Sequence, residues 1–109
     1  DIGKLFPNTD PVYKNISSLE LLKVTYNRLK QNGFKVINTD SVVICEKPKI
    51  SPYINEMKKY ISNAMNNDLH PDSIGIKGKT TEKLGFTGRG EGIAVYTVSL
   101  LYYDTKSKL

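Results

Sequence analysis

The residues best suited to chemistry lie in one stretch, residues 77–92, which reads KGKTTEKLGFTGRGEG. Lysine and arginine side chains supply positive charge there, and Thr80 and Thr81 place hydroxyl groups beside the carboxylate of Glu82. The glycines between residues 85 and 92 allow the backbone to approach a ligand closely or to adopt positive φ angles. Such a loop suits an anion, and a carboxylate next to hydroxyls suits an anion that carries a hard metal ion.

Three other interpretations of this stretch can be weighed from the residues. Thr81 is also a suitable N-cap for a single turn beginning at Glu82, with the glycines forming a mobile surface loop, and this interpretation stays open. A P-loop is excluded, because the first glycine of that motif would fall at Ser73. A dinucleotide fingerprint is excluded as well, because the glycines of residues 88–92 do not have its spacing.

Two amphipathic helices flank the strands that must position this stretch. The first is predicted between the capping sequence Ser17-Ser18-Leu19-Glu20 and Gly33, since apolar residues recur at three- and four-residue spacing. The second is predicted to begin at Ser51 as N-cap, with Pro52 in its first position, and to end at residues 66–68. We assign both apolar stripes to core packing.

Strands are predicted at residues 34–46, 73–79 and 93–103. Residues 38–41 of the first strand are polar and are expected to bend or bulge it. The last strand is apolar on both faces and needs two covers, one from the helices and one from a neighbouring subunit. The alternation predicts a single α/β domain, residues 1–109, with one layer of helices packed on a mixed β-sheet.

The overall composition is that of a soluble globular protein with anionic partners. The net charge is +5, and the lysines are spread along the chain rather than gathered, which speaks against a nucleic-acid footprint. No apolar run has the length of a membrane span. Cys45 is the single cysteine, so no internal disulfide can form and a reducing compartment is favoured. With no histidine beside it, Cys45 is interpreted as a small buried residue rather than a nucleophile.

Three segments carry a resemblance to one known family. The run from Thr80 to Gly92 closely resembles the signature of the 2-C-methyl-D-erythritol 2,4-cyclodiphosphate synthases. Residues 1–7, DIGKLFP, resemble the family's substrate-binding loop, and residues 45–50, CEKPKI, resemble its Pro-Lys turn. The resemblance implies conversion of 4-diphosphocytidyl-2-C-methyl-D-erythritol 2-phosphate to the 2,4-cyclodiphosphate, with release of CMP, in non-mevalonate isoprenoid synthesis. Such an enzyme is a phosphorus–oxygen lyase that performs a cyclising phosphoryl transfer.

The resemblance also implies a role for each matching segment. Thr80 is expected to stabilise the transition state, and Glu82 to hold Mg²⁺ or Mn²⁺. Phe86 and Arg89 match residues near a three-fold axis, where an isoprenoid diphosphate could bind. The turn at residues 45–50 is expected to wrap the cytosine, largely through backbone groups. The substrate-binding residues implied in this way are Asp1, Ile2, Gly3, Phe6, Asn8, Thr9, Asp10, Cys45, Pro48, Lys49, Ile50, Ser51, Lys79, Thr80, Thr81, Glu82, Phe86 and Arg89. Asn8 departs from the family, which usually has aspartate there.

The implied assembly is a homotrimer with its sheets around the three-fold axis and its active sites between subunits. The resemblance covers the C-terminal two-thirds of the family's domain, so the zinc ligands are expected upstream of Asp1 and none lies in this chain. A plastid, if the source is eukaryotic, or a bacterial cytoplasm is the expected compartment. Neither a nucleic acid nor a membrane is expected as a partner. Two other hypotheses stay open, namely a basic nucleotide- or RNA-binding module and a catalytically inactive trimer.

Overall fold

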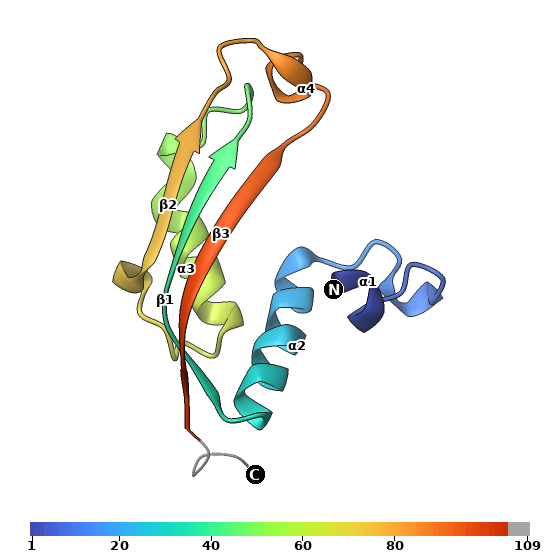
Figure 1. The fold of residues 1–109 in the computed structure, drawn as a ribbon, viewed down its shortest axis with the longest axis vertical. Coiled ribbons are helices and arrows are strands. Elements are labelled where there is room, and N and C mark those ends of the chain that lie inside the picture. The colour runs from blue at the N-terminus through green and yellow to red at the C-terminus, as the bar shows by residue number, and fades with distance from the viewer. Residues whose placement is uncertain (105–109) are drawn as a thin grey trace.

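Three strands form one sheet, and two longer helices pack against one of its faces (Figure 1). The computed structural model describes residues 1–104. Among these residues, no helix has the length and apolar character needed to cross a membrane. In chain order the elements are α1 (Ile2–Leu5), α2 (Ser18–Gln31), β1 (Phe34–Ile44), α3 (Ile54–Ala64), β2 (Ile74–Lys79), α4 (Gly85–Gly88) and β3 (Ala94–Tyr103).

The sheet is mixed, as predicted, and β1 is its central strand. β2 pairs with β1 in parallel, from Thr39↔Ile74 to Ile44↔Lys79, and β3 pairs with β1 antiparallel. The register between β1 and β3 shifts between Val36 and Asn38. This irregularity confirms that β1 is bulged, although it lies just before the polar residues 38–41 that were expected to cause it.

α2 begins and ends where the sequence predicts. The hydroxyl of Ser17 accepts a hydrogen bond from the amide of Leu19 at 3.2 Å. Gly33 follows the helix with φ +87°, the left-handed conformation that glycine adopts without a Cβ penalty. Tyr26 is the most buried residue of its apolar stripe, whereas Leu19, in the first turn, remains exposed.

α3 begins later than predicted. Residues Ser51–Tyr53 form a 3₁₀ turn, and the helix proper starts at Ile54 without a capping side chain. The prediction that Ser51 caps the helix is therefore wrong, because Ser51 lies inside the turn and not before the first unpaired amides. The predicted end is confirmed, since Asn66 and Asn67 both adopt φ +58°.

The core lies between α2, α3 and the sheet. Tyr26, Lys30 and Asp68 form a group of bonded polar side chains beside it, which we call the clasp. Tyr26, Met65, Leu69 and Ile74 are buried against one another. The hydroxyl of Tyr26 donates to Asp68 at 2.6 Å, and Lys30 pairs with the same carboxylate at 2.9 Å. Burial and the bond to Asp68 raise the pKa of Tyr26, while the bonds from Tyr26 and Lys30 lower the pKa of Asp68.

β3 is an edge strand whose apolar side chains are not covered by the described residues. Tyr96 and Val98 are 67% and 70% exposed, and the large hydrophobic residues on the opposite face of the strand are at least 40% exposed. The helix layer therefore does not bury either face of β3 as the sequence led us to expect, because α2 and α3 pack over β1 and β2.

Candidate functional site

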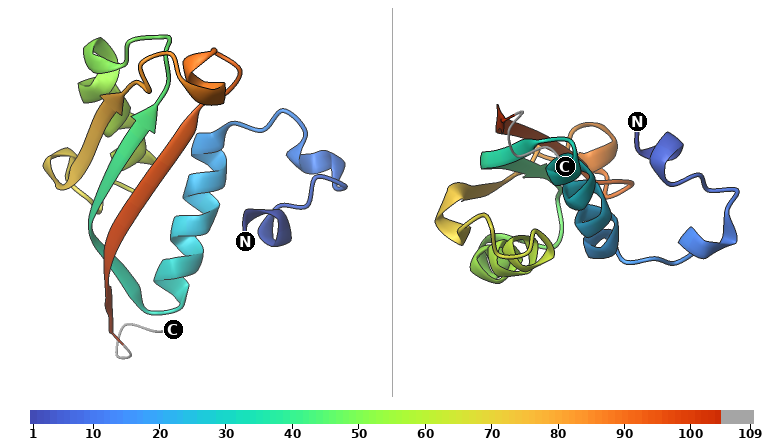
Figure 2. Two further views of the ribbon diagram at one scale, coloured as in Figure 1. Left: turned by 45° about the horizontal axis from the view of Figure 1, so that its top comes forward. Right: turned by 90° about the horizontal axis from the view of Figure 1, so that it is seen from below.

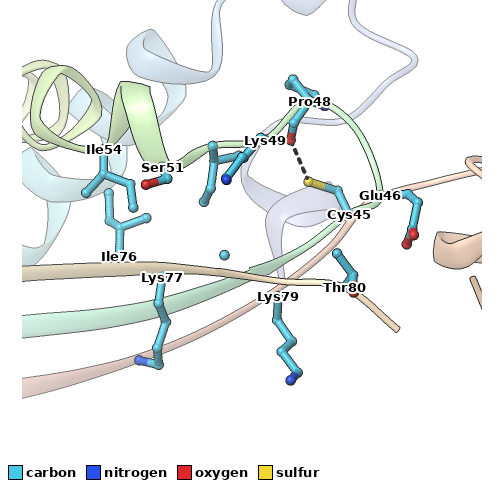
Figure 3. Close-up of a pocket in the computed structure, with 12 residues that line it drawn as sticks. Cys45, Glu46, Pro48, Lys49, Ser51, Ile54, Ile76, Lys77, Lys79 and Thr80 are labelled. Atoms are coloured by element: carbon cyan, nitrogen blue, oxygen red, sulfur yellow. Dashed lines mark hydrogen bonds between the residues drawn. The ribbon is translucent and has the colours of Figure 1, made fainter. Parts of the chain in front are cut away.

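A cavity of about 540 Å³ opens where β1 and β2 end beside the start of α3 (Figure 3). It brings together two segments that the sequence analysis singled out separately, the turn after β1 and the strand that leads into the central stretch. Its lining residues are Cys45, Glu46, Pro48, Lys49, Ile50, Ser51, Ile54, Ile76, Lys77, Gly78, Lys79 and Thr80.

The cavity depends on close packing between these two segments. The amide of Cys45 donates to the carbonyl of Lys79 at 3.1 Å, which extends the pairing of the two strands one residue past the end of β1. Gly78 then faces Ile50, since a Cβ added at Gly78 would lie 2.8 Å from Ile50 Cγ1. Only a residue without a side chain allows this approach. Cys45 is buried, as predicted.

The charged residues of the cavity differ in whether they already form an ion pair. Lys77 pairs with Asp40 at 2.8 Å, so part of its charge is neutralised. Figure 3 shows the side chains of Lys77 and Lys79 projecting from β2 on the side away from Ser51 and Ile54. Lys79 therefore contributes its backbone and the base of its side chain to the cavity wall, and its ammonium group lies toward the open face of the sheet.

Glu46 is a residue whose importance sequence reasoning missed. Its Oε2 atom is buried and has no hydrogen-bond partner among the described residues, although Glu46 lines the cavity. The sequence does not indicate this burial, because a glutamate in a turn that also contains two lysines is typical of a solvent-exposed residue.

The loop after β2 is folded around a tight turn. The amide of Leu84 donates to the carbonyl of Thr81 at 3.0 Å, and Glu82 and Lys83 both adopt positive φ, +53° and +66°. The hydroxyl of Thr81 donates to the Leu84 carbonyl and shares a 3.0 Å hydrogen bond with the hydroxyl of the buried Thr87. Thr81 therefore ties the two ends of the loop together. The interpretation in which Thr81 caps a helical turn at Glu82 is wrong, because α4 begins at Gly85.

Close backbone packing also fixes the far side of this loop. A Cβ added at Gly88 would lie 2.2 Å from the carbonyl carbon of Lys83, so α4 can rest on the turn only with glycine at this position. The turn in this way presents Glu82 at its exposed tip. The amide of Glu82 donates to the hydroxyl oxygen of Thr80 at 3.3 Å, and its carboxylate bonds to no described residue.

The donor set of residues 1–104 fits Mg²⁺ better than Zn²⁺. No group of three or more histidine, cysteine, aspartate or glutamate residues in this part of the chain could hold a metal ion. Zinc, which takes three or four protein ligands, therefore finds no site among these residues. Mg²⁺ is commonly held by one or two carboxylates together with water and substrate phosphates, and the exposed, uncommitted Glu82 fits that chemistry.

The predicted substrate-binding residues of the N-terminal segment lie apart from this cavity. Ile2, Gly3, Phe6, Asn8 and Thr9 line a second cavity of about 610 Å³. In all three views of Figures 1 and 2, α2 lies between this segment and α3. Within one chain, the structure therefore does not bring the two predicted halves of the substrate site together.

Asp1 and Asp10 have local roles in the segment that was predicted to be a loop. Each carboxylate caps a short helical turn, Asp1 by accepting from Lys4 N at 3.1 Å and Asp10 by accepting from Val12 N at 3.1 Å. One oxygen of each aspartate is so engaged, which leaves the other to accept further hydrogen bonds.

Phe86 and Arg89 lie outside both cavities, on the α4 loop. Phe86 is 53% exposed. The guanidinium of Arg89 makes two contacts with Glu91, from Nε at 3.1 Å and from Nη2 at 3.0 Å. Both side chains remain accessible, and Glu91 partly neutralises the charge of Arg89.

Comparison with known proteins finds relatives both by sequence and by structure. A 2-C-methyl-D-erythritol 2,4-cyclodiphosphate synthase of Clostridium acetobutylicum is 54% identical over 101 residues, which are 93% of this chain and 64% of the relative. The synthase of Haemophilus ducreyi is 52% identical over 105 residues, which are 96% of this chain and 64% of the relative. This chain thus spans slightly less than two-thirds of the length of either enzyme.

Two solved structures share the fold. The bifunctional IspDF from Campylobacter jejuni matches with a TM-score of 0.88 and 42% identity, covering 95% of this chain and 28% of that one. A CDP complex of IspF from Plasmodium falciparum matches with a TM-score of 0.76 and 34% identity, covering 93% of this chain and 58% of that one. The model of the YgbB family matches residues 1–102, nearly the whole sequence. The chain belongs to the YgbB family.

Proposed function

We propose that this protein is a 2-C-methyl-D-erythritol 2,4-cyclodiphosphate synthase, which converts 4-diphosphocytidyl-2-C-methyl-D-erythritol 2-phosphate to the cyclic diphosphate and CMP. The observation that carries the proposal is the cavity in which the turn after β1 meets Thr80 and the loop that presents Glu82. Relatives that are 54% and 52% identical bear the name of this enzyme, and a solved relative is a complex with CDP.

In the proposed reaction an oxygen of the 2-phosphate attacks the β-phosphorus in line. A new P–O bond closes the ring, the P–O bond between the β-phosphorus and the bridging oxygen breaks, and CMP leaves with that electron pair. Because no protein group reacts covalently, the chain contributes positioning and electrostatic stabilisation.

The residues of this chain divide those tasks. The hydroxyl of Thr80 accepts from the Glu82 amide and donates its proton to no described residue, so the proton is available to a phosphate oxygen. Glu82 would hold Mg²⁺ or Mn²⁺, which when bound neutralises charge on the diphosphate oxygens. The turn at residues 45–50 would hold the cytosine, with the apolar side chains of Ile50, Ile54 and Ile76 excluding water.

The active enzyme is proposed to be a homotrimer with its sites between subunits. Two features support this assembly: the two halves of the predicted substrate site lie apart within one chain, and β3 exposes a row of apolar side chains. A hydrophobic face of this kind favours association over solvent exposure. Phe86 and Arg89 would then lie near the three-fold axis and accept an isoprenoid diphosphate.

Zinc and the cellular compartment belong to the same proposal. The zinc ligands would come from residues that precede Asp1 in the family's domain. The compartment would be a bacterial cytoplasm, or a plastid in a eukaryotic source.

The test is an assay of the full-length protein with the cytidyl substrate, Zn²⁺ and Mg²⁺, followed by ³¹P nuclear magnetic resonance. We expect the cyclic diphosphate and CMP to appear in equal amounts. Binding of the substrate without turnover would contradict the proposal and favour a nucleotide-binding module instead. Light scattering tests the assembly separately, since a stable monomer at micromolar concentration is incompatible with shared sites.

A further inference from the structure

Glu46 lines the proposed nucleotide cavity, and one of its carboxylate oxygens is buried without a hydrogen-bond partner. Glu46 Oε2 is buried, and neither a hydrogen bond nor an ion pair reaches it from any of residues 1–104. Burying a polar group without a hydrogen bond costs free energy, and the cost is larger for a charged group. A buried oxygen without a partner therefore calls for an explanation, such as a water molecule, an ion or a bound ligand.

The position of Glu46 suggests what could satisfy it. Figure 3 shows its carboxylate at the edge of the group of lining residues, on the side of Thr80 and away from Ser51 and Ile54. The three lysines that line the cavity do not pair with it: Lys77 is bound to Asp40, and Lys49 and Lys79 form no ion pair with a described residue. A ligand in the cavity therefore meets one acceptor-only carboxylate among apolar side chains and the hydroxyls of Ser51 and Thr80.

An ionised carboxylate accepts hydrogen bonds and donates none. Of the two pyrimidine bases, cytosine presents an exocyclic amine, which donates, while uracil presents a carbonyl at the same ring position. Glutamate and aspartate side chains accept from this amine when proteins read cytosine in nucleic acids. A carboxylate in this cavity would thus attract cytosine and repel uracil.

We propose that Glu46 is a specificity-determining residue, which accepts a hydrogen bond from the exocyclic amine of the cytosine base. The proposal rests on the proposed function, because it places a cytidine nucleotide in this cavity. It adds a side-chain contact to the backbone contacts expected of the turn.

Binding requires a movement of the side chain, and the structure allows one. Oε2 is enclosed, but Glu46 as a whole is only partly buried and lies in a turn. Rotation about its side-chain bonds can bring the carboxylate toward the cavity without moving the backbone. The lack of a partner for Oε2 makes this rotation inexpensive, because no hydrogen bond to the described residues is broken.

The test is calorimetric titration of the full-length protein and its E46Q and E46A variants with CMP and with UMP. Wild type is expected to prefer CMP. Glu46→Gln keeps the shape, but its amide can also donate to the uracil carbonyl, so the ratio of CMP to UMP affinity should fall about tenfold. Glu46→Ala removes the acceptor and should lower the ratio by a similar factor. Because removal of a negative charge strengthens phosphate binding for both nucleotides alike, the ratio isolates recognition of the base.

Glu56→Gln is the matched control, since Glu56 is an exposed residue of α3 that does not line the cavity. The ratio of CMP to UMP affinity of this variant should equal that of the wild-type protein. An E46Q ratio within twofold of wild type would overturn the role of Glu46 while leaving backbone readout and the enzyme intact. A change of oligomeric state without a change of ratio would also overturn it, since it would show that a second copy supplies the missing donor. Absence of CMP binding by the wild-type protein would instead contradict the proposed function itself.

Discussion

The amide of Cys45 donates to the carbonyl of Lys79 at 3.1 Å, and this bond joins the two segments that form the candidate site. It fixes the start of the turn after β1 against the end of β2. With the bond in place, Pro48 and Ile50 on one segment face Gly78 and Thr80 on the other. The position of the nucleotide relative to the reacting phosphates would thus be set by the parallel pairing of β1 and β2.

Gly78→Ala should weaken nucleotide binding more than it weakens the fold. The new Cβ would lie 2.8 Å from Ile50 Cγ1, so Ile50 must move into the cavity. We expect the affinity for CMP to fall about tenfold, which corresponds to the lower end of the cost of overpacking. Calorimetry measures the affinity, and Gly90→Ala is the control, because φ +72° strains it but no atom lies within 4 Å of its new Cβ. Equal losses in both variants would show that cavity shape is not the cause.

Thr80→Ala and Thr81→Ala should have opposite effects on rate and stability. Loss of the Thr80 hydroxyl removes one preorganised donor, which by analogy with oxyanion sites should cost about 10²–10³ in turnover. Loss of the Thr81 hydroxyl breaks its bonds to Leu84 and Thr87 and should destabilise the protein by about 1 kcal/mol. Steady-state kinetics and denaturant unfolding of both variants check this. Turnover by Thr80→Ala at the wild-type rate would remove Thr80 from the catalytic machinery.

Asp68→Asn should destabilise the protein near neutral pH and have little effect in acid. Hydrogen bonds from Tyr26 and Lys30 lower the pKa of Asp68 in the folded protein. Between the folded pKa and the unfolded value of about 3.9, the unfolded state binds more protons, so stability falls as the pH falls. The stabilisation from Asp68 is thus complete above about pH 4 and is lost as the pH falls through the lower, folded value.

Denaturant unfolding at about pH 7 and about pH 3 measures this difference. We expect a loss of about 1 kcal/mol for Asp68→Asn at the higher pH, which shrinks at the lower one. Tyr26→Phe is a second test of the same interaction, because it keeps the ring in the core and removes only the hydroxyl bonded to Asp68. A loss for Asp68→Asn that does not depend on pH would show that the carboxylate charge is not what stabilises the clasp.

Local signals predict most of the fold. Ser17 and Gly33 bound α2 because capping and positive φ depend on neighbouring residues alone. α3 begins later than Ser51 indicated, since Ser-Pro begins a 3₁₀ turn as readily as an α-helix. The exposure of β3 could not be predicted, because it depends on which surfaces the helices reach and on partners outside the chain.

The candidate site was predicted in parts rather than as a whole. The resemblance located residues 45–50 and Thr80 as parts of a substrate site, and in the structure Cys45, Glu46, Pro48, Lys49, Ile50 and Thr80 line one cavity. The tie between Thr81 and Thr87 was missed, because a hydroxyl pair six residues apart depends on the positive φ angles of the turn. Glu46 was missed because burial of one carboxylate oxygen is a property of packing and leaves no trace in the sequence.

Turnover of the Glu82→Gln variant tests the central claim most directly. Glu82 lies at the tip of its turn with no bond from its carboxylate to a described residue, so the substitution should leave the fold unchanged. If Glu82 holds a divalent ion on the diphosphate, loss of its charge weakens that ion's site. The measurement is the rate of CMP release by the full-length enzyme at increasing Mg²⁺. We predict a steep loss of rate and a higher Mg²⁺ concentration for half-maximal activity; a wild-type rate with an unchanged Mg²⁺ requirement would contradict the account.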